Sequence, residues 1–326
     1  MCNLFKSKRL RHKIITAIFI FYCFILYDSF LFTSNTYAEP EIKSILSDGL
    51  NKVIPQVIQN YSDDLPEWAK RTDFSLHFQD DLKPLWSFET IQPIFRTKET
   101  SRHTLFIQDR FAYDTPDDTI NLGLGYRYIT SNEQWLLGVN TFWDYTFDRR
   151  HSRIGIGGEI LGQFASIHAN YYEAISGHRY YFEDEGMASE KALDGWDVEG
   201  QIQMPFMPWV HTSMKGYGWQ NEVLNDVEGY SLAFIMNITK NITLELGRDD
   251  NDARENNFIK VSFTLGGPER VEYTMIENLF MKTFFTYRDL KKQSLAKVRR
   301  NHNIAVEKVR LVSVTAGGGV FIGRGT

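Results

Sequence analysis

Two glycine clusters have the spacing of phosphate-binding loops: Gly123-Leu-Gly125 and Gly155-Ile-Gly157-Gly158. Glycines in such loops let the backbone approach a dinucleotide phosphate when a strand precedes them and a helix follows. Both clusters lie instead inside segments that alternate apolar residues with small or polar ones, and no helical pattern follows either. They are typical of glycines on one face of a β-strand, so we expect no cofactor.

Histidines and acidic residues could support metal binding or hydrolysis. Neither His168 nor His178 has a cysteine or carboxylate at metal-ligand spacing. A hydrolase would need a histidine beside a serine or an acid in one loop cluster, and the candidates are Asp114, Asp148, His151, His178, Asp184 and Asp250. No motif selects a set of these, so solvated loop charge is favoured. We therefore expect no catalytic residue, no metal and no enzyme. Contact of the acidic loops 183–185 and 249–252 with divalent cations or lipopolysaccharide is the alternative.

The N-terminal residues 1–38 have the layout of a secretory signal peptide. Five basic residues precede an apolar run at 14–27, and residues 36–38 suit cleavage between Ala38 and Glu39. An uncleaved membrane anchor is the alternative. Cleavage changes the net charge from −5 to −9, because 31 basic and 40 acidic residues remain, and it removes both cysteines, Cys2 and Cys23. A cysteine-free, acidic exported chain fits an oxidising compartment and does not favour a nucleic-acid partner.

Periodicity divides the remaining chain. Apolar residues spaced by three and four between Ile42 and Val57 predict a short amphipathic helix, interrupted by Pro55, in a periplasmic lead-in at residues 39–70. The pattern then changes over residues 71–265 to twelve alternating segments of about ten residues, as in membrane β-strands. The clearest is 135–145, where Trp135 and Val139 share an apolar face and Asn140 lies on the other. The turn 130–133 joins it to the segment at 121–128 in a predicted hairpin.

The alternation fits either a soluble β-sandwich or a membrane barrel. No segment after residue 38 has the roughly 20 apolar residues of a spanning helix, so a membrane protein here must cross as a closed barrel. Aromatic residues at the ends of segments fit girdles at two membrane interfaces, and the opposite face is rich in Gly, Asn, Gln, Glu and Arg, as in a hydrated lumen. We therefore predict an all-β, twelve-stranded antiparallel outer-membrane barrel.

Several motifs occur in the order and spacing of a known family. Residues 121–128 (NLGLGYRY), 135–145 (WLLGVNTFWDY) and 153–159 (RIGIGGE) are followed by 169–177, 195–200 and, after the last strand, 298–304 (VRRNHNI). Together they resemble the translocator barrel of the inverse autotransporters, the intimin and invasin family. The barrel residues that carry the resemblance are Gly123, Gly125, Tyr126, Arg127, Tyr128, Gly138, Asn140, Trp143, Asp144, Tyr145, Gly155, Gly157, Glu159 and Gly177. Those in the linker are Arg299, Arg300, Asn301, Asn303 and Ile304.

The resemblance implies a type V secretion module for cell adhesion, whose C-terminal continuation passes through the pore to the cell surface. It also implies partners: outer-membrane lipid and lipopolysaccharide, the barrel-assembly machinery, periplasmic chaperones and, given a passenger, a host-surface receptor. Twelve antiparallel crossings return the chain to its starting side, so any displayed segment must thread the lumen. Residues 277–300 are expected to form a helix that plugs the lumen, with basic residues facing Glu159, Asp197 and Glu199.

The residues after the barrel differ from the family pattern. The 61 residues at 266–326 are fewer than the ~100 of an immunoglobulin-like domain, and 316–326 show no strand series. We expect a pore-threading helix and linker without a complete passenger: a bare barrel, a truncated product or one piece of a split system. A small channel with a periplasmic tail is the main alternative, and a rim hydrolase is the third.

Overall fold

The computed structural model describes residues 66–80, 83–97, 102–113, 117–183, 186–252, 254–264, 268, 270–310 and 318–321. The predicted signal peptide, including Ala38 and Glu39, lies outside the described residues, and so does the predicted lead-in helix up to residue 65. The same holds for Asp114 and Asp184. The first described element is a short 3-10 helix, η2 (Ala69–Arg71).

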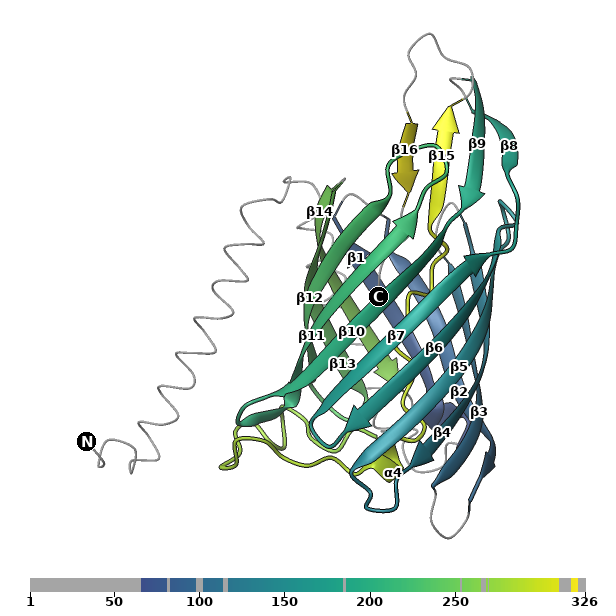
Figure 1. The fold of residues 1–326 in the computed structure, drawn as a ribbon. Coiled ribbons are helices and arrows are strands. Elements are labelled where there is room, and N and C mark those ends of the chain that lie inside the picture. Colours follow the sequence, from purple (N-terminus) through teal and green to yellow (C-terminus); the bar gives the residue numbers. More distant parts are fainter. Residues whose placement is uncertain are drawn as a thin grey trace, which may run out of the picture. The chain divides into compact units, whose positions relative to one another are not determined.

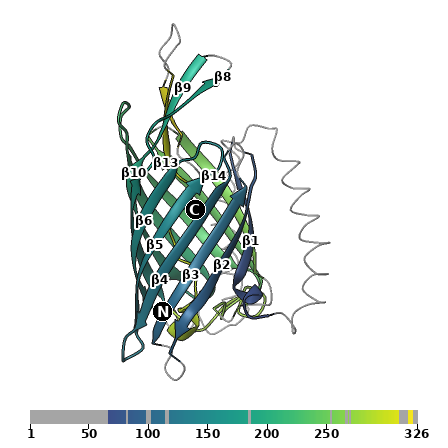
Figure 2. The same ribbon diagram turned by 90° about the vertical axis from the view of Figure 1, so that its right-hand side faces the viewer.

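Twelve antiparallel strands form a closed barrel (Figures 1 and 2). Neighbours along the chain pair with one another, β7 pairs with β10, and β1 closes the barrel against β14, with Asp73 opposite Thr264. This confirms the predicted fold. The strands are β1 (Thr72–Gln79), β2 (Leu85–Arg96), β3 (His103–Tyr113), β4 (Thr119–Ile129), β5 (Trp135–Thr146), β6 (Ser152–Gly162), β7 (Ala165–Ala174), β10 (Asp194–Met204), β11 (Met207–Gln220), β12 (Val227–Asn237), β13 (Ile242–Asn251) and β14 (Arg254–Thr264).

Side chains alternate between the two faces of the wall, as the period of two predicts. On β5, Trp135, Leu137 and Val139 point outward and are 49%, 41% and 62% exposed, whereas Asn140 and Asp144 point into the lumen and are buried. Aromatic side chains gather at one end of the outer face, where Trp86 stacks on Tyr113 and Trp143 on Tyr145. An apolar outer band bordered by aromatic residues is typical of a surface that a bilayer covers.

The two ends of the barrel differ. We call the end where β1 begins and β14 ends the near rim; it carries the hairpin turns at 130–134, 163–164, 205–206 and 238–241. The opposite end, the far rim, carries a second sheet in the order β16-β15-β9-β8 (Figure 1). Its strands are β8 (Arg179–Glu183), β9 (Gly186–Ala192), β15 (Val306–Arg310) and β16 (Gly318–Phe321).

The chain after β14 corrects two predictions. Within residues 277–300 the structure has one helix, α4 (Leu290–Gln293). After its last turn, residues 297–305 run through the lumen without helical hydrogen bonding. The predicted lumen-plugging helix is therefore wrong. The tail was also expected to lack strands, yet β16 pairs with β15, with Phe321 opposite Val306. Among the described residues, no helix is long and apolar enough to cross a bilayer.

Candidate functional site

The candidate site is the contact between the barrel lumen and residues 294–305, which we call the lumen linker. It starts after α4 at the near rim and ends at β15 on the far rim (Figure 1). Leu290 of α4 packs on Ile129, Leu136 and Leu161 at the start of the path. Ala305 packs among Tyr172, Trp219 and other buried residues at its end. The linker is thus fixed at both ends by apolar contacts with the wall.

The linker's Arg300 forms a fully buried ion pair with the wall. Its Nη1 and Nη2 donate to the two carboxylate oxygens of Asp144 on β5, at 2.8 and 2.7 Å. Arg153 on β6 donates to the same carboxylate at 2.7 Å, and Asn121 on β4 adds a bond of 2.8 Å. Both arginines and Asp144 are buried. A bidentate pair in such a place fixes the position of the linker as well as neutralising its charge.

Aromatic rings enclose the two guanidinium groups. The Cζ of Arg300 lies 4.2 Å from the ring centroid of Phe142, and that of Arg153 lies 4.2 Å from the ring centroid of Tyr172. Cations over ring faces are stabilised by the ring quadrupole, more strongly where water is excluded. The cluster therefore compensates part of the cost of burying two positive charges.

Wall side chains bind the backbone of the linker. A chain that is neither helix nor strand has no internal partners for its N–H and C=O groups, and burying such groups unpaired is costly. Asn121, Arg153 and Asn170 donate to the carbonyls of His302, Asn301 and Arg299, at 2.8, 2.9 and 3.0 Å. Gln108 and the Tyr172 hydroxyl accept from the N–H groups of Val298 and Asn301, at 2.9 and 2.7 Å. These polar wall positions explain why an extended linker is stable in the lumen.

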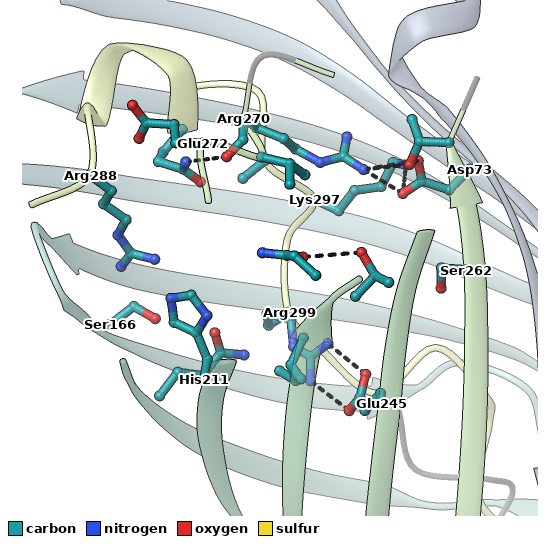
Figure 3. A pocket seen from close by; sticks show the side chains of 18 of the residues that line it. Asp73, Ser166, His211, Glu245, Ser262, Arg270, Glu272, Arg288, Lys297 and Arg299 are labelled. Carbon is teal, nitrogen blue, oxygen red and sulfur yellow. Dashed lines mark hydrogen bonds and ion pairs between the residues drawn. The ribbon is translucent and has the colours of Figure 1, made fainter. Parts of the chain in front are cut away.

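Two further cations of the linker reach the other side of the lumen. Arg299 pairs with Glu199 on β10 at 2.9 Å and with Glu245 on β13 at 3.1 Å. Lys297 pairs with Asp73 on β1, which also binds Arg270 at 2.8 Å. Figure 3 shows Lys297 and Arg270 directed toward Asp73, and Arg299 toward Glu245. The linker thereby crosslinks strands on opposite sides of the barrel.

One motif glycine makes room for this arrangement. A Cβ on Gly155 would lie 2.9 Å from Nη2 of Arg300 and 3.2 Å from Cδ1 of Tyr172. Gly158, on the outward face of the same strand, has open space where a Cβ would lie. Because Arg300 is held by Asp144 and cannot simply move away, the lumen at Gly155 requires a residue without a side chain.

At the far rim, the emerging chain is bound by backbone pairing. β15 lies antiparallel to β9, with Val306 opposite Ala192, and the Leu193 N–H donates to the Ala305 carbonyl at 2.9 Å. The Glu307 carboxylate accepts from the N–H groups of Glu222, Val223 and Leu224, at 3.1, 2.9 and 2.6 Å. The β11–β12 loop therefore binds the first residues that leave the lumen.

A buried polar contact joins the second sheet to the barrel. His151 bonds through one ring nitrogen to Ser176 and through the other to Glu190 on β9, each at 3.1 Å. Burial raises the pKa of Glu190, but hydrogen bonds from His151 and Tyr181 outweigh it and hold that pKa below its ordinary value. Burial raises the pKa of the nearby Asp117 to about 6.

The lumen linker leaves a polar cavity of about 230 Å³ beside it, in the near-rim half of the barrel. The cavity is bounded mainly by β1 and β10 to β14, together with the linker (Figure 3). His211, Lys260 and Glu245 line it from the wall, and Arg288 lines it from the segment before α4. The linker therefore does not lie at the centre of the lumen.

The predicted acidic partners divide into three cases. Glu199 pairs with Arg299, as expected. Glu159 instead forms an ion pair within the wall, with Arg127, whose guanidinium also donates to the linker carbonyl of Ser294. Asp197 accepts hydrogen bonds from Tyr172 and from the N–H of Asn301. Of the three predicted acidic residues, Glu199 alone forms a salt bridge with a basic side chain of the linker.

The motif residues occupy different places. Several lie at Arg300 or next to it in the wall: Asp144, Gly155, Gly157, Asn140 and Asn301. Gly138 lies beside Glu159. Asn303 bonds to Asn301, and Ile304 packs on Ala192. Gly123 and Gly125 adjoin Phe142 and Phe106 in the lumen. Four others lie on the outer face: Tyr126, Tyr128, Trp143 and Tyr145. Gly177 follows β7 at the far rim.

Sequence reasoning missed several residues that contact the linker. They are Asp73, Gln108, Asn121, Arg153, Asn170, Tyr172 and Glu245. Asn121, Arg153, Asn170 and Tyr172 lie within the motif stretches 121–128, 153–159 and 169–177. All seven share one signal, a polar or aromatic residue at a lumen position of an alternating strand. That signal marks the face but does not select the residues that meet the linker.

The rim residues considered for catalysis take part in other contacts. His151 is fully buried in its contact with Ser176 and Glu190, and His178 contacts Ser189 and Glu222. Asp250 accepts a bond from Tyr230. Within the described residues, no group of three or more His, Cys, Asp or Glu side chains could hold a metal ion.

Comparison with known proteins places this arrangement in a family. The model of the inverse autotransporter beta-domain matches residues 29–302, which include all twelve strands and most of the lumen linker. The chain belongs to the inverse autotransporters. Members of this family are translocator barrels of the intimin and invasin type, and this one is an outer-membrane β-barrel.

Individual relatives agree over part of the inverse autotransporter barrel. An attaching and effacing protein homolog of Escherichia coli K12 is 33% identical over 128 residues, which are 39% of this chain and 42% of that protein. The inverse autotransporter adhesin YeeJ of the same strain is 30% identical over 122 residues, 37% of this chain and 5% of the adhesin. The chain thus matches less than half the length of either.

A solved structure supports the barrel fold. The structure described as "Unveiling the Mechanism Behind the in-meso Crystallization of Membrane Proteins" superposes with a TM-score of 0.58 at 19% identity. The superposition covers 73% of this chain and 99% of that one. At this identity the likeness concerns the fold alone.

Proposed function

We propose that this inverse autotransporter barrel anchors its lumen linker across the outer membrane and exports the chain that follows β15 to the cell surface. In this proposal residues 1–38 are a cleaved signal peptide, so the near rim faces the periplasm and the far rim faces outward. The mechanism is passive. The wall holds the linker through ion pairs and backbone hydrogen bonds, and no catalytic step is involved.

The observation that supports this most is the path of the chain. β14 ends at the near rim, residues 294–305 pass through the lumen, and β15 leaves at the far rim against β9. Wall side chains bind the linker backbone along this path, and Asp144 and Glu199 bind its two adjacent arginines. A tail that remained at the near rim would leave these buried wall charges without their partners.

The proposal includes partners that the family resemblance implies. The barrel-assembly machinery and periplasmic chaperones deliver the strands, and lipid and lipopolysaccharide surround the finished barrel. Adhesion, with any host-surface receptor, would be a property of the exported chain. The barrel's own part is to anchor and to deliver.

The test is protease accessibility of an epitope tag placed after Thr326, on intact cells. A matched tag between β2 and β3, on the near rim, serves as the protected control, with a periplasmic marker to verify that the cells are intact. We expect protease to remove the C-terminal tag from intact cells and to reach the β2–β3 tag after lysis. Protection of both tags until lysis would contradict export.

The second candidate is a small channel, which the cavity beside the linker favours. Conductance across planar bilayers separates the two. A plugged translocator conducts little until residues 277–300 are deleted, whereas a channel conducts with the chain intact. Open-channel conductance of the intact protein, together with a protected C-terminal tag, would make the channel the better assignment.

A further inference from the structure

Residues 275–287, which we call the near-rim segment, form a second apolar surface outside the strands. Eight of their thirteen residues are Met, Ile, Leu, Phe or Tyr, and the charged ones are Glu277 and Lys282. The segment precedes α4 and lies at the same end of the barrel (Figure 1). The lumen contacts described above do not involve it.

The segment runs along three neighbouring turns of the near rim. The Met275 N–H donates to the Asn237 carbonyl at the end of β12, at 2.9 Å. At the β10–β11 turn, Phe206 donates to the Phe284 carbonyl at 2.9 Å and accepts from Met281 at 2.8 Å. Just beyond the segment, the Arg288 N–H donates to the Gln163 carbonyl in the β6–β7 turn, at 3.0 Å. Backbone bonds thus fix the segment to consecutive hairpins.

It also covers part of the wall. The first four residues of β11, Met207–Val210, are all buried, although alternate side chains of a barrel strand point to opposite faces. Farther along β11, Met214 points outward and is 61% exposed. Trp209 donates its indole N–H to the Leu279 carbonyl at 3.0 Å. The near-rim segment therefore packs against this end of β11.

The exposed surface of the near-rim segment is itself apolar. Ile276, Leu279, Phe284 and Tyr287 are 71%, 49%, 56% and 66% exposed. Phe285 stacks on Phe164 with ring centroids 5.0 Å apart, and Phe284 meets Phe206 at 5.3 Å. These rings continue the outer apolar band at the near-rim ends of β6 and β10, where Ile160 and Ile202 are both 46% exposed. Clustered exposed side chains of this size mark an interaction surface.

We propose that the near-rim segment is an interfacial anchor that inserts Leu279, Phe284 and Tyr287 into the headgroup and acyl boundary of the adjoining phospholipid leaflet. Continuity with the lipid-facing wall selects lipid as the occupant, because the exposed rings of the segment adjoin the turns that follow the outward-facing Ile160 and Ile202. Phe and Tyr suit this depth, where an apolar ring is buried and a hydroxyl stays hydrated. Naming the leaflet as the periplasmic one rests on the proposed function, whereas the lipid contact does not.

The test uses the full chain, with Cys2 and Cys23 replaced by serine and single labelling sites at Leu279→Cys and Phe284→Cys. Each carries an environment-sensitive nitrobenzoxadiazole label in phosphatidylethanolamine and phosphatidylglycerol vesicles, with and without doxyl-labelled lipid. Lys282→Cys is the control within the segment, and Ile202→Cys is the control for a strand position in lipid. We expect quenching at 279 and 284 to approach that at 202 and to exceed that at 282 by roughly twofold. Each variant is first checked for folding by heat-modifiability.

A variant-free measurement accompanies the labels. Wild-type protein is crosslinked to a phospholipid with a diazirine in its acyl chain, and tryptic peptide 283–288 is examined for adducts. Adducts on this peptide are expected. Equal water exposure at 279, 284 and 282, or adducts confined to the strands, would overturn the proposal. So would quenching that disappears as the protein is diluted in lipid, because a second copy would then be the occupant. None of these readouts depends on whether the C-terminal tag reaches the cell surface.

Discussion

The two sides of the lumen contact the linker in different ways. On one side, β3 to β7 carry aromatic rings, Gly155 and polar side chains that bind the linker backbone directly. We call this side the clamp wall. On the other side, β11 to β14 and β1 contribute short polar side chains and charges around a cavity of about 230 Å³, and single long side chains such as Arg299 span the gap. We call this side the cavity wall.

The difference shows where the specificity for the linker lies. The clamp wall meets backbone and side chains together, so a shift of the linker by one residue would break several bonds at once. The cavity wall contacts the linker through the charged ends of long, flexible side chains such as Arg299, so these contacts would tolerate such a shift better. Most of the motifs that resemble the inverse autotransporters lie on β4 to β7, which belong to the clamp wall.

The largest expected effect comes from Asp144→Ala. It would leave Arg153 and Arg300 buried without their shared carboxylate, and breaking a buried ion pair in this way costs roughly 3–5 kcal/mol. Urea unfolding followed by tryptophan fluorescence measures it, with Asp148→Ala in the exposed far-rim loop as the control. If Asp144→Ala proves too unstable to refold, Arg300→Met removes the linker partner and keeps the wall pair. A loss of unfolding free energy no greater than that of the control would contradict the conclusion that the clamp wall specifies the position of the linker.

The next effect compares two glycines of β6. Gly155→Ala places a methyl group against Arg300 and Tyr172, and forcing atoms into a packed site costs about 1–3 kcal/mol. Gly158→Ala meets open space and should stay within about 0.5 kcal/mol of the wild type. The same unfolding measurement applies to both. Equal effects would mean that Gly155 is not needed for the linker's position.

A smaller effect is expected on the cavity wall. Glu245→Gln removes one of the two carboxylates that bind Arg299 and leaves Glu199 in place. Losing one hydrogen-bonded contact while its partner stays satisfied costs about 0.5–1.5 kcal/mol. The expected order of destabilisation is therefore Asp144→Ala, then Gly155→Ala, then Glu245→Gln. A larger loss for Glu245→Gln than for Gly155→Ala would reverse the ranking of the two walls.

The smallest effect concerns pH at the far rim above the clamp wall. Burial raises the pKa of Asp117 from 3.8 to about 6, so the folded protein favours the protonated form. The contribution of Asp117 to stability is therefore greatest below the unfolded pKa and falls as the pH rises through about 6. Asp117→Asn should keep the hydrogen bond from the Asp148 N–H. It should slightly stabilise the protein at pH 8 and flatten the profile between pH 4 and 6. An unchanged profile would show that Asp117 is well hydrated.

Much of the barrel could be predicted from the sequence because strand alternation is local. The alternation from Trp135 to Tyr145 predicts one outward and one inward face, and the polar turn at 130–133 predicts the hairpin that joins β4 to β5. The glycine clusters were correctly assigned to strands, since no helix follows them. The helix expected at 277–300 was wrong for a tertiary reason. Wall side chains bind the backbone of residues 298–302, and the β10–β11 turn binds that of 281–284, so neither stretch needs helical hydrogen bonds.

The sequence by itself determined the strands, their two faces and the polar character of the lumen, because these depend on a period of two and on the solvent that each face meets. The tertiary structure decided which charges meet. Asp144 and Arg300 are 156 residues apart and come together because the barrel closes and the chain turns back through it. Closure also placed the linker against β3 to β7 and left the cavity on the opposite side. Pairing across such separations depends on strand order and shear, which no local pattern records.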